Sequence, residues 1–109
     1  MSASVADQID PQIARELWIS FVSLLRSYTA AHGLNGTRQA VLEVSNGRLL
    51  IRAGERLLAV QFDGERGSFA RESGTPTEFT LDEHGRVIID NKAEDMDMVA
   101  ERLAREIMR

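Results

Sequence analysis

Between residues 40 and 70, apolar and polar positions alternate with the period of two that is typical of β-strands. Three two-residue turns divide this stretch: Asn46-Gly47 and Asp63-Gly64, which suit type I′ hairpins, and Gly54-Glu55, which suits type II′. Since a one-residue slip would turn a strand over, the three turns together define one register. In that register one face of a four-stranded antiparallel meander carries Leu42, Val44, Leu49, Ile51, Leu58, Val60 and Phe69.

The same alternation continues after a loop at residues 72–76. Strands are predicted at 77–82 and 86–90, with Gly85 where a type I turn and bulge need a left-handed residue. The sheet is therefore expected to cover about residues 38–90 with about six antiparallel strands. The apolar face of the last two strands carries Phe79, Leu81, Val87 and Ile89.

Helical spacing of apolar residues appears before the predicted sheet. Asp10 can cap free backbone N–H groups, and Pro11 has the fixed φ that suits a first helical position. A helix is predicted over residues 11–32, with His32 as a surface residue of its last turn and Gly33 as its left-handed cap. The broad apolar stripe consists of Ile13, Ala14, Leu17, Trp18, Phe21, Val22, Leu24, Leu25, Tyr28 and Ala31.

A second helix is predicted after the sheet, over roughly residues 91–108. Asn91 would be its N-cap, and Glu94 would complete a capping box. The predicted fold is a single α+β domain over residues 1–109, in the order helix, six-stranded meander, helix, with residues 1–9 as a flexible leader. Its largely buried residues are expected to include Leu17, Phe21, Leu42, Ile51, Leu58, Val60 and Leu103.

The second face of the meander is only half polar, whereas a sheet face left to water usually alternates to polar residues. Either the two helices lie on opposite faces, or the sheet curls on itself, or the face meets a second copy of the chain, or it roofs a ligand cavity. The homodimer would place an apolar centre inside a charged rim. Its interface residues would be Val41, Leu50, Leu57, Arg48 and Arg52, with Ala59, Ala70, Glu43, Gln61 and Arg66 around them.

Composition fits one folded domain: the 109 residues are 43% apolar and 28% charged, with a net charge of −4. This acidity argues against non-specific binding to nucleic acid or anionic membranes. The chain has no cysteine, which excludes disulfides and thiolate chemistry. The first ten residues lack the basic start of a signal peptide, and the apolar stretch 17–25 is too short to span a bilayer, so a cytoplasmic location is expected.

Few residues suggest catalysis or metal binding. The chain has two histidines, His32 and His84, and no nucleophile elbow, phosphate-binding loop or HExxH pattern. Residues 82–84 (Asp-Glu-His) resemble a cation site, but a turn already accounts for Asp82 and Gly85. No catalytic residue, metal or cofactor is therefore expected. Arginines gather on the second sheet face, yet the phenylalanines on which bases would stack fall on the other face, which disfavours nucleic acid.

Three classes of function remain. The leading hypothesis is a non-catalytic interaction module that forms a homodimer or, in a variant, binds another polypeptide as a chaperone does. The second is a small-ligand or lipid-binding cup between the long helix and a curved sheet, lined by Trp18, Phe21 and Tyr28. The third is an enzyme with a general acid or base, for which the inner strands supply no carboxylate.

Overall fold

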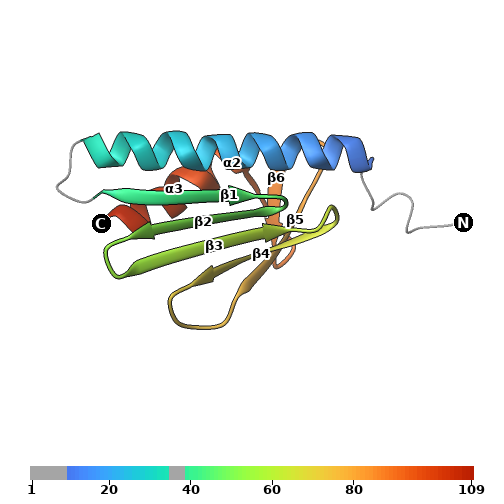
Figure 1. The fold of residues 1–109 in the computed structure, drawn as a ribbon. Helices are drawn as coiled ribbons and strands as arrows, with labels where there is room; N and C mark the ends of the chain where they lie inside the picture. The colour runs from blue at the N-terminus through green and yellow to red at the C-terminus, as the bar shows by residue number, and fades with distance from the viewer. Residues whose placement is uncertain (1–9, 35–38) are drawn as a thin grey trace, which may run out of the picture.

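The computed structural model describes residues 10–34 and 39–109, so the leader expected at residues 1–9 lies outside the described residues. Helix α2 (Pro11–Leu34) precedes a seven-stranded antiparallel meander, and helix α3 (Met96–Met108) follows it (Figure 1). The predicted α+β class is confirmed, with seven strands in place of six. The strands are β1 (Ala40–Ser45), β2 (Arg48–Ala53), β3 (Arg56–Phe62), β4 (Arg66–Arg71), β5 (Thr77–Leu81), β6 (Arg86–Ile89) and β7 (Lys92–Asp95).

The predicted facing of the strands is confirmed, and so is the register across the turns at residues 46–47 and 54–55. Ser45 pairs with Arg48 across the first turn, Ala53 with Arg56 across the second, and every neighbouring pair of strands is antiparallel.

The β3–β4 pairing was predicted wrongly by two residues: Phe62 pairs with Gly67, so the turn lies at Gly64-Glu65 and not at Asp63-Gly64. The Asp63 carboxylate accepts the N–H groups of Glu65 and Arg66, which accounts for this turn.

The turn glycines Gly47, Gly64 and Gly85 have the expected positive φ values, of 71°, 105° and 76°. Asn46 and Asp63 are not among the described positive-φ residues, so neither turn is of the predicted type I′. The turns still place each side chain on its predicted face, because a shift of two residues leaves the faces unchanged.

Replacing Gly47 with valine is expected to lower the free energy of unfolding by about 1–3 kcal/mol, because valine strains the left-handed backbone. A Cβ at Gly47 would also lie 2.6 Å from the carbonyl oxygen of Phe62. Gly54→Val is the matched control, since Gly54 has a φ of 62° but nothing within 4 Å of a built Cβ. Urea unfolding should therefore rank Gly47→Val as the more destabilising change, and equal midpoints would contradict the predicted clash.

The start of the second helix was predicted wrongly. Residues 92–95 form β7, which pairs with β6, and α3 begins at Met96. Asp90 and Asn91 have φ values of 52° and 66°, so Asn91 belongs to a tight turn and does not cap a helix. Asp and Asn tolerate the left-handed backbone conformation that this turn needs. The turn allows residues 92–95 to form backbone hydrogen bonds with β6 in place of helical ones.

Helix α2 begins as predicted and ends later. The carboxylate of Asp10 accepts the N–H of Gln12 at 2.8 Å, which confirms the N-cap. Gly33 was predicted to be the left-handed cap, but it lies inside the helix and is not among the described positive-φ residues. Glycine permits the left-handed conformation without requiring it, and here the helical hydrogen bonds continue to Leu34.

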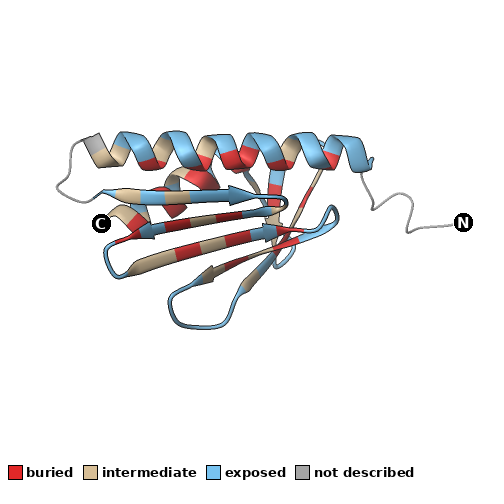
Figure 2. Cartoon of the chain, in the orientation of Figure 1, coloured by how far each residue is buried: buried red, intermediate tan, exposed pale blue. Residues whose placement is uncertain are grey.

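Both helices cover the same face of the sheet, which is called the inner face below. In Figure 1, α3 lies behind β1 and β2, α2 runs beside them, and the face of β1–β4 turned toward the viewer carries no helix. Buried residues alternate along the central strands in Figure 2, as the predicted register requires. The strand residues of the inner-face core are Leu49, Ile51, Ala53, Leu58, Val60, Phe62, Phe69, Phe79, Leu81 and Val87.

The centre of this core is aromatic. Phe21 of α2 is fully buried and meets the rings of Phe69 and Phe79 edge-on, with centroids 6.1 and 5.9 Å away. Phe69 and Phe79 are stacked, with centroids 4.5 Å apart. Gly67 makes room for this stack, since a Cβ at that position would lie 2.2 Å from the Phe79 ring. A strand glycine thus serves ring packing here.

Burial of Phe21, Ile51, Leu58, Val60 and Leu103 is confirmed. Two other predicted core residues, and one residue predicted for the apolar face, are more exposed than expected. Leu17 and Leu42 are only half-buried, and Val44 is 52% exposed although its partner Leu49 is fully buried. The strand β1 is an edge strand and α2 covers it incompletely, so correct facing did not ensure burial.

Candidate functional site

The three aromatic residues predicted to line a ligand cup have separate environments. Phe21 is enclosed in the core, and Trp18 is 8% exposed and stacks on Phe62 at 5.6 Å between ring centroids. Tyr28 is half-buried and donates its hydroxyl hydrogen bond to Asp97 of α3. Of the three, only Trp18 borders one of the two clefts described below.

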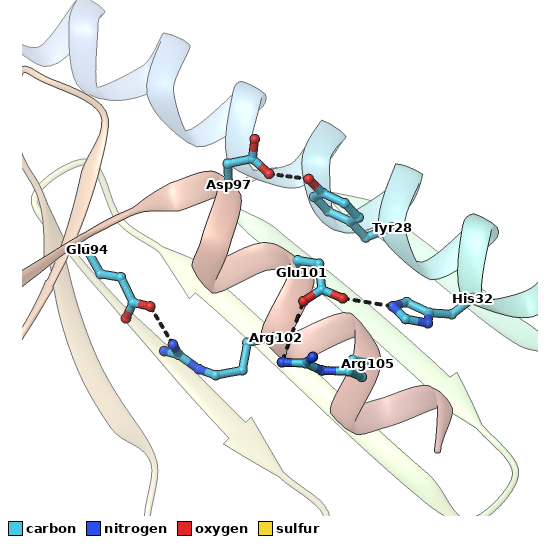
Figure 3. Close-up of polar contacts among 7 residues, drawn as sticks. All are labelled: Tyr28, His32, Glu94, Asp97, Glu101, Arg102 and Arg105. Atoms are coloured by element: carbon cyan, nitrogen blue, oxygen red, sulfur yellow. Dashed lines mark hydrogen bonds and ion pairs between the residues drawn. The ribbon is translucent and has the colours of Figure 1, made fainter.

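Polar contacts join the two helices along one line (Figure 3). Tyr28 contacts Asp97, and one turn further along both helices a ring nitrogen of His32 lies 3.1 Å from a carboxylate oxygen of Glu101. The hydrogen bond to Asp97 raises the pKa of Tyr28, so the phenol stays protonated at neutral pH. Arg105 approaches Glu101 at 3.6 Å from the same helix.

These contacts were missed by the sequence analysis, which placed His32 on the free surface. The signal was present as two pairs at i, i+4 spacing, Tyr28 with His32 and Asp97 with Glu101, which place each pair on one helix face. Among the hydrogen bonds of the described residues, no hydroxyl group contacts His32. The contacts of Tyr28 with Asp97 and of His32 with Glu101 therefore position α3 against α2.

Residues 82–84 form a turn, as predicted. The Asp82 carboxylate accepts the backbone N–H groups of His84 and Arg86, each at 2.9 Å. Burial alone would raise the pKa of Asp82, but these hydrogen bonds outweigh it and hold the pKa below its ordinary value. Within the described residues, no group of three or more His, Asp or Glu side chains is arranged to hold a metal ion.

The five residues predicted for a dimer interface share the outer face of the sheet. Leu50 pairs with Glu43 and Ala59, and Leu57 pairs with Arg52, so all point away from the helices. Leu50 and Leu57 are nevertheless half-buried by their strand neighbours, whereas Val41 is 63% exposed. Arg48 and Arg52 are exposed at its rim. A shallow hollow of about 550 Å³ lies beside Arg48, bordered also by Gln61, Ser68 and Glu78.

The two edges of the sheet differ. The edge strand β7 has four residues, of which Lys92, Glu94 and Asp95 are charged. The edge strand β1 has six residues, and Glu43 is its one charged member. Charges, short length and a covering helix each protect an edge from pairing with another chain. The strand β7 has the first two, whereas β1 has α2 running beside it (Figure 1).

Exposed apolar side chains gather beside the β1 edge. Val41 is 63% exposed on the outer face, Val44 is 52% exposed on the inner face, and Ile19 of α2 is 59% exposed. Ile19 and Val44 border a cleft of about 630 Å³ between α2 and the β1–β2 turn, called the α2–β1 cleft. The sequence analysis placed Val44 on the apolar face of the meander and did not identify this region.

Comparisons with known proteins assign the chain to no family. No protein-family model, curated protein or solved structure matches the chain. None of the helices among residues 10–34 and 39–109 is long and apolar enough to cross a lipid bilayer.

Proposed function

We propose that the protein is an interaction module that forms a homodimer by pairing β1 with the β1 strand of a second copy. The observation that carries this proposal is an edge strand with a single charged residue, incompletely covered by α2, with exposed apolar residues on both of its faces. Such an edge is a template for strand addition. A two-fold axis uses the same strand in both copies, so the association closes at two chains.

The sequence of β1 is suited to pairing with itself. Its inner-face residues are Ala40, Leu42 and Val44, opposite the buried residues of β2. With the two-fold axis at Leu42, the two Leu42 side chains face each other and each Val44 faces an Ala40 of the partner. An axis at Glu43 would instead place two carboxylates directly opposite, which is unfavourable. The Leu42-centred pairing therefore extends the apolar inner face across both copies.

The β1 edge fits a second copy better than the outer face does. Leu50 and Leu57 form the centre of the outer face and are already half-buried within the single chain. Three of the five most exposed large apolar residues among the described residues, Ile19, Val41 and Val44, lie at or beside β1. More apolar area is thus available for burial at the edge.

Val44→Lys is expected to convert the dimer to a monomer, because a lysine on the inner face of β1 would bring a charge into the paired apolar row. The mass measured by sedimentation should fall from two chains to one, while circular dichroism remains that of the folded wild type. Leu50→Asp is the matched control on the outer face and should leave the mass unchanged. A monomeric wild type, or loss of the dimer only in Leu50→Asp, would contradict the proposal.

Single cysteines test the register, since the chain has none of its own. Leu42→Cys should form an intermolecular disulfide on oxidation, because directly opposite Cα atoms lie about 4.5–5.5 Å apart. Val44→Cys should not, because four residues along the strand separate its two copies by about 13 Å. Efficient cross-linking of Val44→Cys and not of Leu42→Cys would exclude the Leu42-centred pairing.

A further inference from the structure

We infer that the α2–β1 cleft is a binding site for an amphipathic carboxylate, a molecule with an aliphatic chain and one anionic end. The cleft, of about 630 Å³, has the volume typical of small-molecule sites. This inference concerns one chain by itself and does not depend on the homodimer.

The apolar wall of the cleft comes from one stripe of α2. Trp18, Ile19 and Val22 follow each other at helical spacing, and Val44 of β1 stands opposite. Ile19 and Val44 are more than half exposed, so water covers apolar carbon that an aliphatic chain would cover instead. The cleft thus offers a favourable contact for a hydrocarbon chain.

The charged residues at the same cleft are both arginines. Arg15 and Arg26 border it eleven residues apart on α2, which places them about 16 Å apart along the helix axis. Among the residues described, no acidic side chain borders the cleft, and neither arginine has an ion pair or a side-chain hydrogen bond. In a chain with a net charge of −4, this local excess of positive charge favours an anion.

The two features together define the ligand class. A guanidinium can hold a carboxylate through two parallel hydrogen bonds, while the chain lies against Trp18, Ile19 and Val44. A cation of the same chain length would meet two positive charges. A short carboxylate would lose the apolar contact. Both the charge and the chain are therefore needed for tight binding.

Trp18 supplies the measurement, because it is the chain's single tryptophan and borders the cleft. Titration with decanoate below its micelle-forming concentration should shift the Trp18 emission, and calorimetry should show saturable binding. Decyltrimethylammonium, which carries the opposite charge, and acetate, which lacks the aliphatic chain, should bind far more weakly. Comparable binding of either control ligand, or no decanoate binding by both methods, would overturn the inference.

Charge reversal locates the site. The double variant Arg15→Glu with Arg26→Glu should weaken decanoate binding by about tenfold or more. Arg52→Glu with Arg66→Glu makes the same change in charge on the outer face and should bind decanoate as the wild type does. If the two double variants lose affinity equally, the effect is one of overall charge and the proposed site is wrong.

The ligand site and the dimer can fail separately, although Val44 takes part in both. Leu42→Lys should abolish the dimer, because two lysines would face each other at the two-fold axis, but it should retain decanoate binding, because Leu42 does not border the cleft. The Arg15→Glu and Arg26→Glu variant should lose decanoate binding while Leu42→Cys, introduced into the same variant, still cross-links.

Discussion

Phe21→Ala is expected to lower the free energy of unfolding by about 3–5 kcal/mol. The ring is fully buried and contacts three other rings, those of Trp18, Phe69 and Phe79, which belong to α2, β4 and β5. Its removal takes away transfer free energy and leaves a cavity that rigid aromatic neighbours cannot fill. Urea unfolding, monitored by circular dichroism at a fixed protein concentration, measures the loss.

Met98→Ala is the control for this prediction. Met98 is 60% exposed on α3, so its truncation should change the free energy of unfolding by no more than about 0.5 kcal/mol. A similar small change for Phe21→Ala would mean that the aromatic cluster is not the centre of the core.

Leu58→Ala is expected to cost about 2–5 kcal/mol of unfolding free energy. Leu58 is 2% exposed on the inner face of β3, between Ile51 of β2 and the position of Arg71 on β4. The removed atoms leave a cavity in the core on the inner face of the sheet. The denaturant midpoint should fall without a change in the slope of the transition.

Leu57→Ala makes the same chemical change on the neighbouring residue and tests the facing of the strand. Leu57 points to the outer face and is half-buried, so its truncation should cost clearly less than that of Leu58. Equal losses would show that the outer face is packed as tightly as the inner one and would contradict the one-sided core.

Strand pairing could be predicted from the sequence because turn chemistry is local. Asn46-Gly47 and Gly54-Glu55 join their flanking strands in the predicted register, and the period of two then assigns each side chain to a face. At the third turn the pairing is shifted by two residues, which leaves the faces unchanged. The same reasoning failed at Asp90-Asn91, where the residues suited a helix cap as well as a left-handed turn. Pairing of β7 with β6 favoured the turn over the helix cap, and strand pairing is not encoded in the turn residues alone.

Burial could be predicted less well than facing. Val44 and Leu49 point to the same face and pair directly, yet one is 52% exposed and the other is fully buried. The difference comes from the position of β1 at the edge and the path of α2 above it. Neither is encoded in the alternation of apolar and polar residues.

The candidate sites could not be predicted from the sequence either, because they too depend on how the helices pack on the sheet. Arg15 and Arg26 are ordinary surface positions on a helix until α2 lies beside the β1–β2 turn. Tyr28 and Asp97 are 69 residues apart in the chain and meet only because both helices lie on one face of the sheet.

The sequence by itself determined the antiparallel meander, the register of its first two hairpins and its apolar face, since two-residue turns and side-chain alternation act over a few neighbouring residues. Only the tertiary structure decided that both helices share the inner face, that α2 runs beside the edge strand β1 and that a cleft forms between them. Those features depend on how α2 and α3 pack on the sheet, and several helix placements can bury a broad apolar stripe equally well.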